Sequence, residues 1–209
     1  MRKAFMMVAA AMMAAMSLSL TSCKEKGKSP TPQPAEANVE KEKTENGTET
    51  YFEAIDNYLT EQIASHYAEG EKIGDATSDV VCIPCHTIVG VDEQDSTDIK
   101  VWGDYWVFNY RLSGDTLKCV SGGSHPGLMH VRQTGGHFEV TAFDGVEDGS
   151  RFLPSARRIF AGHLADFQKI AADEKNRQQV RTAAVAAYAE QHHLAATMYQ
   201  DYGWPPVKF

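Results

Sequence analysis

The segment from Ile99 to Leu112 places the strongest constraint on how this chain can fold, because its side chains alternate with a period of two residues. One predicted face carries Trp102, Trp106, Phe108, Tyr110 and Leu112, and the other carries Val101, Gly103, Tyr105 and Val107. Alternation in a run rich in aromatic and β-branched residues predicts one long β-strand. An aromatic face of this kind belongs more often to a hydrophobic core than to a ligand site.

Further strands are predicted on both sides of this segment. The expected strands are 80–91, 99–112, 116–120, 128–133 and 137–143. Ser113-Gly114-Asp115 and Gly135-Gly136 have the composition of hairpin turns. Ser121–Gly127, with three glycines and one proline, breaks the alternation, and we interpret it as a loop between two strands.

Helical periodicity is found before and after the strands. The predicted helices are 51–69, the segment from Pro154 to about Ile170, and the segment after Asp173 to about His193. Thr50-x-x-Glu53 is a capping-box pattern at the start of the first helix. The tail at 199–206 is aromatic and ends in two prolines, so it is not helical, and we expect its aromatic side chains to pack on the domain.

The order of the elements predicts an α+β fold, in which an N-terminal helix packs on a curved antiparallel sheet and C-terminal helices follow. We expect the helices to lie on one face of the sheet. The helix at 51–69 and the meander at 80–143 resemble the cystatin-like and nuclear-transport-factor-like cone folds. The resemblance implies a concave sheet that the helix closes at one end and that can open as a pocket at the other.

The first 23 residues resemble a bacterial lipoprotein signal peptide. A short basic start precedes a mostly apolar run that stops at Leu20, before the length that a spanning helix needs. Leu20-Thr21-Ser22-Cys23 resembles a lipobox, which implies that Cys23 is acylated and becomes the first mature residue. Two or more acyl chains anchor a protein stably. The alternative is an ordinary secreted protein with a chance cysteine.

The expected organisation is a signal peptide at 1–22, a lipidated disordered tether at 23–50 and a single α+β domain at 51–209. The tether is rich in Lys, Glu, Thr and Pro and has too few apolar residues to bury a core. Lys24 after the lipidated cysteine favours the outer membrane, by analogy with the sorting rule of enteric bacteria. The expected location is therefore the cell envelope, anchored in the outer membrane at the periplasm.

Two segments of the body, Gly122–His130 and Gln200–Trp204, resemble lipoproteins of anaerobic gut and oral bacteria that have no assigned chemistry. This resemblance implies a location and no activity. Loss of the two basic residues of the signal peptide leaves 18 basic and 28 acidic residues, a net charge of −10. An acidic body lacks the electrostatic footprint of a nucleic-acid-binding protein. It is also repelled by anionic lipid, so we expect the lipid on Cys23 to hold the protein at the membrane.

The segment Cys82-Ile83-Pro84-Cys85-His86 matches the attachment signature of c-type haem, in which both thiolates add to vinyl groups and the histidine ligates iron. In c-type cytochromes this motif lies at a turn or on a helix. Here β-branched residues flank it on both sides, at 80–81 and 87–89. We expect extended structure and no cofactor at Cys82, Cys85 and His86, with a haem c protein in electron transfer or haem handling as the alternative.

Other interpretations of the cysteines remain open. In a regular strand, residues three apart face opposite sides and lie about 10 Å apart, so a disulfide between Cys82 and Cys85 needs a turn or bulge at Pro84. One of them could instead pair with Cys119 on a neighbouring strand. The interpretation we favour is that all three are small buried apolar residues. No second Cys or His pair has the spacing of a zinc finger, so we expect no metal.

Ser121–His130 is the strongest candidate for a pocket. Its glycines could cradle an anion with backbone N–H groups, and His125 and His130 could act as acid or base. We expect any functional pocket near this segment and Trp106, at the open end of the sheet. The alternative is a sharp connection whose glycines supply positive φ, with His130 an ordinary strand residue.

The sequence contains no Gly-x-Ser-x-Gly, no His-Glu-x-x-His and no phosphate-binding loop. We therefore expect a membrane-anchored lipoprotein that is not an enzyme and that binds a small ligand or an envelope protein. The alternatives are the haem protein and a cone-fold enzyme that uses His125 or His130. The expected partners are the membrane, through the Cys23 lipid, and that ligand or protein, with no nucleic acid.

Overall fold

The computed structural model describes residues 50–67 and 79–209, which belong to one compact unit, Val39–Phe209. The predicted signal peptide, Cys23 and all but the last residue of the predicted tether lie outside the described residues, as does the end of the predicted helix at 51–69. The architecture is α+β, as predicted.

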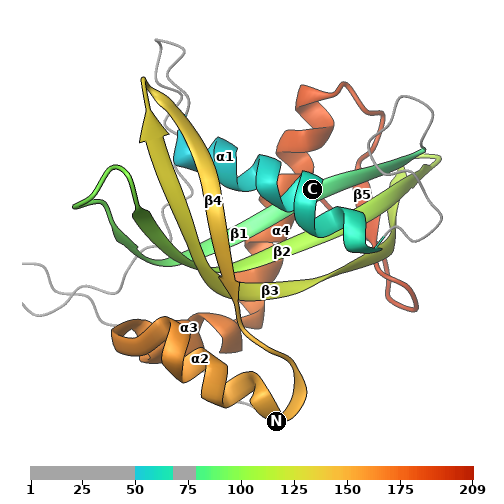
Figure 1. Ribbon diagram of the computed structural model, residues 1–209. Coiled ribbons are helices and arrows are strands. Elements are labelled where there is room, and N and C mark those ends of the chain that lie inside the picture. Colours follow the sequence, from blue (N-terminus) through green and yellow to red (C-terminus); the bar gives the residue numbers. More distant parts are fainter. Residues whose placement is uncertain (1–49, 68–78) are drawn as a thin grey trace, which may run out of the picture. The chain divides into compact units, whose positions relative to one another are not determined.

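A six-stranded sheet forms the centre of the unit. Its strands are β1 (Val80–Asp92), β2 (Ile99–Ser113), β3 (Thr116–Thr134), β4 (His137–Gly145), β5 (Met198–Gln200) and β6 (Val207–Lys208). The order is β1-β2-β3-β5-β6, and β4 pairs with β3. All pairings are antiparallel except β3 with β5. Figure 1 shows the sheet curling strongly around the first helix.

The concave side of the sheet is covered by α1 (Tyr51–Tyr58), which continues as a π-helical turn, η1 (Leu59–Ile63), and a 3-10 turn, η2 (Ala64–Tyr67). The backbone N–H of Thr50 donates to Glu53 Oε2 at 3.2 Å, as the capping-box pattern predicts. The core on this side contains Ile55, Leu59, Ile63, Cys82, Val101, Tyr105, Val107, Met129 and Val131. The amphipathic first helix is thus confirmed.

The convex side is covered by α2 (Phe152–Phe160), α3 (Leu164–Ala172) and α4 (Glu174–Gln191). Val185 of α4 packs in one core with Ile83, Cys85, Phe108, Tyr110, Leu117 and Tyr199. Ala156, Ile159 and Phe160 of α2 and Phe167 of α3 pack in another core with Leu128 of the sheet. The expectation that all helices lie on one face is therefore wrong. Both faces of β2 are apolar, so helices have to cover the sheet on both sides. The predicted division of the β2 residues between two faces is confirmed.

The predicted helix from Pro154 to Ile170 is two helices. A 3-10 turn, η4 (Ala161–His163), separates α2 from α3, and Ala161 adopts φ +42°. Positive φ is costly for a residue with a Cβ. The break brings the rings of Phe160 and Phe167 into a stack at 4.1 Å. The predicted cap at Asp173 is confirmed, because its side chain accepts from Asn176 N at the start of α4.

Candidate functional site

Cys82 and Cys85 lie in strand β1, in the extended structure that the β-branched flanks predict. Cys82 belongs to the core under α1, and Cys85 to the core under α4. Each is only 5% exposed. The two thiols therefore project from opposite faces of one strand.

Neither thiol is in the thiolate form that acts as a nucleophile or metal ligand. Burial raises the pKa of Cys82 to about 11 and that of Cys85 to about 12, so both stay protonated at neutral pH. Cys82, Cys85 and Cys119 are all free thiols. Because β2 separates β1 from β3, Cys119 is not on a strand that neighbours β1. The two disulfide alternatives are therefore not formed.

His86 faces α1 as an ordinary packed side chain. Its ring stacks on Phe52 at 5.4 Å between centroids, and its Nδ1 lies 3.2 Å from Asp56 Oδ1. A haem attached at this motif would have to accept both thiols at one edge of the ring. Two thiols buried on opposite faces of β1 do not fit that attachment. Among the described residues, no group of three or more His, Cys, Asp or Glu side chains gathers as a metal site.

Ser121–Gly127 is not a loop, and this expectation is wrong. The segment is the middle of β3, which pairs with β2 along nearly its whole length. Its glycines allow close packing instead of turning the chain. At Gly122, with φ +155°, a Cβ would collide with the carbonyl oxygen of Val107, and at Gly123 it would collide with the hydroxyl of Tyr67.

The two histidines of this segment lie on opposite faces of the sheet. The ring of His125 is on the α1 side, where its Nε2 is 2.7 Å from the Tyr67 hydroxyl. His130 is on the other side, with Nδ1 2.6 Å from Asp98 Oδ1 and Nε2 3.6 Å from Asp144 Oδ2. The structure does not bring the histidines together.

Trp106 is also apart from both histidines. Its register partner on β3 is Ser124, whereas the partner of His130 is Lys100, farther along β2. The guanidinium of Arg177 on α4 lies 5.1 Å from the Trp106 ring centroid. The indole is therefore covered by a helix and does not line an open end of the sheet.

Asp104, a carboxylate beside this region, is 4% exposed and accepts a hydrogen bond from the Ser124 hydroxyl at 3.0 Å. Burial raises the pKa of Asp104, against the opposing effects of that hydrogen bond and of the Arg177 charge. It lies on the face away from His125. No acid–base pair with that histidine is formed.

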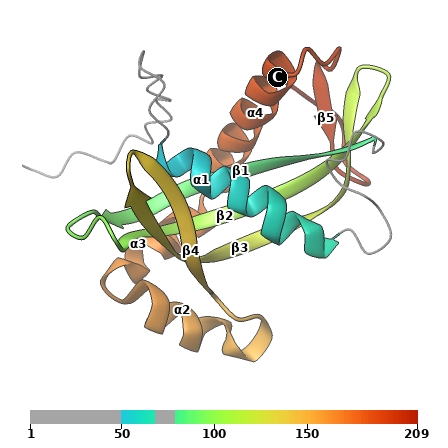
Figure 2. The same ribbon diagram turned by 45° about the horizontal axis from the view of Figure 1, so that its top comes forward.

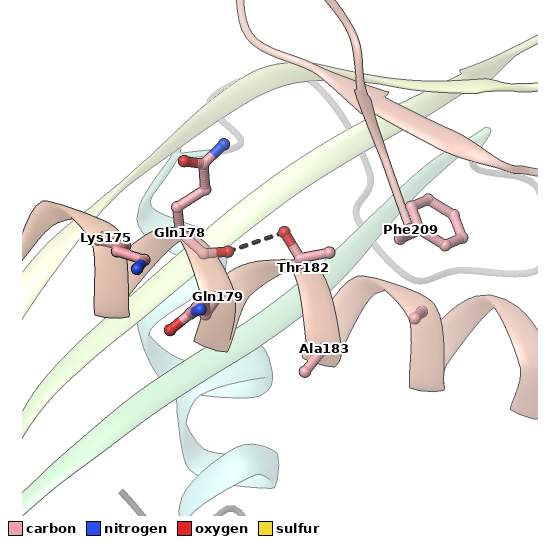
Figure 3. Close-up of a pocket in the computed structure, with 7 residues that line it drawn as sticks. Lys175, Gln178, Gln179, Thr182, Ala183 and Phe209 are labelled. Carbon is pink, nitrogen blue, oxygen red and sulfur yellow. Dashed lines mark hydrogen bonds between the residues drawn. The ribbon is translucent and has the colours of Figure 1, made fainter. Parts of the chain in front are cut away.

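A shallow pocket of about 480 Å³ lies on the outer side of α4 (Figure 3). Its lining consists of Lys175, Gln178, Gln179, Thr182, Ala183, Ala186 and Phe209. The Thr182 hydroxyl is already used, because it donates to the Gln178 carbonyl oxygen at 2.8 Å and lies 3.1 Å from the Tyr199 hydroxyl. None of the lining side chains is a carboxylate, an imidazole or a thiol, so this pocket is poorly equipped for catalysis.

The most exposed aromatic side chains of the described residues lie on the turn 201–206, between β5 and β6. Tyr202 is 98% exposed and Trp204 is 70% exposed. The expectation that the tail aromatics pack on the domain is thus confirmed for Tyr199, which is 2% exposed, and wrong for these two. We name residues 201–206 the aromatic turn.

The aromatic turn is fixed to α4 by an ion pair. Both terminal nitrogens of Arg181 donate to the carboxylate of Asp201, at 2.7 and 2.5 Å, and its Nε donates to the Tyr110 hydroxyl at 2.7 Å. The guanidinium lies 3.7 Å from the Phe108 ring centroid and 4.7 Å from that of Tyr199. Burial lowers the pKa of Arg181, but Asp201 and Tyr110 outweigh this effect, so the guanidinium stays charged.

Further hydrogen bonds close the turn itself. The Trp204 N–H donates to the Asp201 carbonyl oxygen at 3.1 Å, and Gln200 Nε2 donates to the Trp204 carbonyl oxygen at 2.8 Å. Gly203 supplies φ +79°, which a residue with a side chain rarely adopts. The two rings therefore project from a backbone that is already ordered. The sequence signal for this turn is Gly203 followed by the two prolines, which indicates a turn but not the exposure of the rings.

No family model, no curated protein and no solved structure matches this chain. The resemblances to cone folds and to bacterial lipoproteins therefore stay predictions. Within residues 50–67 and 79–209, no helix has the length and apolarity that crossing a bilayer requires.

Proposed function

We propose that this chain is a lipid-anchored protein of the bacterial cell envelope that binds a partner protein, without catalysis, through its aromatic turn. The observation that carries the proposal is the exposure of Tyr202 and Trp204 on a backbone held by Arg181 and Asp201. Soluble domains rarely hold two large aromatic rings in water on an ordered segment without a use for them.

Aromatic side chains of this type are the residues that dominate binding energy at protein interfaces. Trp and Tyr are enriched among interface hot spots, where they fill pockets of the partner. A rigid turn reduces the entropy lost on binding. Rings that project outward fit a pocket on another macromolecule better than a small ligand, which needs a concave site. A protein partner is therefore favoured over a small molecule.

The lipid anchor rests on the sequence, through the lipobox at Leu20–Cys23 and the polar segment after it. Fractionation of cells that express Cys23→Ala provides the test. The variant should be soluble or uncleaved, whereas the unchanged protein should sediment with membranes. Mature Cys23→Ala protein in the membrane fraction would contradict the anchor.

The partner can be sought by photocrosslinking in the native cell envelope. A benzophenone amino acid at position 202 should give one discrete adduct, and the same group at position 52, an exposed aromatic site on α1, should not. The captured protein is then purified and titrated. Trp204→Ala should weaken binding about thirtyfold, the effect of losing a hot spot, and Phe52→Ala should leave it unchanged. Equal losses for both variants would refute the proposed surface.

A further inference from the structure

The outer side of α2 combines exposed apolar and basic side chains. The helix buries Ser155, Ala156, Ile159 and Phe160 against the sheet. Its first residues, Phe152 and Leu153, remain 40% and 42% exposed. Arg157 and Arg158 lie exposed in its last turn, and the nine residues of α2 include no acidic residue. The Phe152 ring is directed toward α3, 6.5 Å from the Phe167 ring centroid, so Leu153 is the apolar residue of the outer side. We call Leu153, Arg157 and Arg158 the α2 patch.

The charge of this patch is opposite to that of the chain as a whole, which has 28 acidic and 20 basic residues. Arg151, just before the helix, is paired with Glu147 at 2.6 Å. For Arg157 and Arg158, no carboxylate within the described residues lies at ion-pair distance. Two guanidinium groups on the same helix as the exposed Leu153 thus face solvent without an acidic partner.

We infer that the α2 patch binds the surface of an anionic phospholipid bilayer. Guanidinium groups bind phosphate oxygens through two parallel hydrogen bonds, and apolar side chains beside them enter the boundary between headgroups and acyl chains. The inference rests on the proposed function in one respect: the lipid on Cys23 keeps the domain next to the bilayer. At the resulting effective concentration a weak contact is enough.

The composition of the patch favours a membrane over an acidic protein. Basic side chains beside an exposed apolar one, on a helix without acidic residues, are typical of a helix that lies in a membrane interface. Figures 1 and 2 place α2 and β5 at opposite ends of the unit. A domain that rests on the bilayer through α2 therefore presents the aromatic turn away from the lipid, free for a partner.

The test uses the chain from residue 24 onward, without its lipid, and flotation with vesicles. This chain keeps all three hydrophobic clusters of the described residues, so it retains the folded unit. It should float with vesicles of phosphatidylglycerol and phosphatidylcholine, and not with phosphatidylcholine alone. Binding should weaken at high ionic strength. Absence of binding to the anionic vesicles would overturn the inference.

The double variant Arg157→Gln/Arg158→Gln should lower the partition coefficient about thirtyfold, since each basic residue near an anionic surface contributes about a factor of five. The matched control, Lys118→Gln/Lys208→Gln, removes the same charge from exposed positions near the aromatic turn and should change little. Equal losses would mean that net charge alone governs binding, against the inference. Leu153→Ser, which leaves the charge unchanged, should also weaken binding.

The same variants separate this inference from the proposed function. If Arg157→Gln/Arg158→Gln weakens binding of the captured partner and leaves vesicle binding intact, α2 contacts a protein and the inference is wrong. If Trp204→Ala has no effect on the partner while the vesicle results hold, the aromatic turn is wrong and the α2 patch stands. The vesicle assay contains no Cys23 lipid, so its outcome is also independent of the anchor.

Discussion

The two segments whose residues suggest chemistry, Cys82–His86 and Ser121–His130, are packed within the fold, whereas the aromatic turn exposes its rings to solvent. Cys82–His86 and Ser121–His130 lie within long strands and pack against α1, α4 or neighbouring strands. The aromatic turn contains no motif of known chemistry, yet it holds Tyr202 and Trp204 in solvent. The cysteines and histidines that suggested chemistry are thus packed or hydrogen-bonded within the fold, whereas two aromatic side chains remain exposed to solvent.

The difference lies in whether the surroundings satisfy each side chain. His125 is hydrogen-bonded to Tyr67, and His130 to Asp98. These partners occupy the polar groups that a ligand would need. At the aromatic turn the backbone and Asp201 are satisfied, but the rings have no apolar cover. The exposed apolar area, and not the residue type, is what marks a candidate surface.

The largest contrast should appear in thiol reactivity. In the native mature protein at pH 8, Cys82 and Cys85 should react with a disulfide reagent at least about a hundredfold more slowly than in urea. Burial keeps the reagent away and raises both pKa values, to about 11 and about 12, so little thiolate forms. Stopped-flow absorbance gives both rates.

An absorption spectrum of the protein purified from its native host provides the companion measurement. We expect no Soret band after acid-acetone extraction, and an intact mass without haem. A Soret band that survives extraction would show that Cys82 and Cys85 are joined to haem. In that case β1 cannot have the arrangement described here.

Removal of the ion pair that holds the aromatic turn should lower the stability of the fold markedly. Asp201→Ala leaves the Arg181 guanidinium, whose side chain is 12% exposed, without its carboxylate. We expect a loss of about 3 kcal/mol in the free energy of unfolding, the lower end for a broken buried pair, since Asp201 is partly exposed. Urea denaturation followed by circular dichroism measures it. Asp201→Asn, which keeps the shape, should lose less; a loss below 1 kcal/mol for Asp201→Ala would mean that the pair does not fix the turn.

The glycines of β3 should prove structural. Gly122→Ala forces a methyl group against the Val107 carbonyl oxygen at an unfavourable φ, and we expect a loss of about 2 kcal/mol. Gly162→Ala is the matched control, because a Cβ there meets no atom within 4 Å. The control should be neutral or slightly stabilising. If Gly122→Ala were as stable as the control, the segment would have room to act as the loop that the sequence suggested.

The sequence was sufficient to predict the elements whose pattern is local and repeated. The alternation at 99–112 predicted β2 and both of its faces, and the capping box and helical spacing predicted α1. The aspartate cap predicted the start of α4. In each case the property that determines the structure, the burial of one face or the satisfaction of one terminal N–H, is present in the residues themselves.

The remaining features depend on contacts between distant segments. From the sequence, Gly122 and Gly123 were interpreted as turn residues. In the structure, Val107 on β2 leaves no room for a Cβ at Gly122, and Tyr67, at the end of the first helical segment, leaves none at Gly123. The break at Ala161 arises from packing of α2 and α3 on the sheet. The anchor of the aromatic turn likewise needs Arg181 to reach Asp201, which spacing along the chain does not reveal.

A smaller effect is expected from the pair that occupies His130. The hydrogen bond from His130 lowers the pKa of Asp98 below its usual value. A lowered carboxyl pKa stabilises the folded state above about pH 4 and loses this contribution as the pH falls further. Since Asp98 is 39% exposed, we expect less than about 1 kcal/mol. The free energy of unfolding between pH 5 and pH 2.5 should fall less steeply for His130→Phe; parallel curves would contradict the coupling.

The smallest effect is expected where function is proposed. Tyr202→Ser and Trp204→Ser remove rings that are 98% and 70% exposed, so the free energy of unfolding should change by no more than about 0.5 kcal/mol. Tyr199→Ser, three residues earlier but buried, should cost several kcal/mol by leaving a cavity and is the positive control. Urea denaturation of the three variants gives the comparison directly. A loss above about 1 kcal/mol at Tyr202 or Trp204 would show that the rings stabilise the fold, and their exposure would then be no argument for a partner. Stability preserved together with weakened partner binding would separate the two roles, since the turn would contribute to recognition and not to folding.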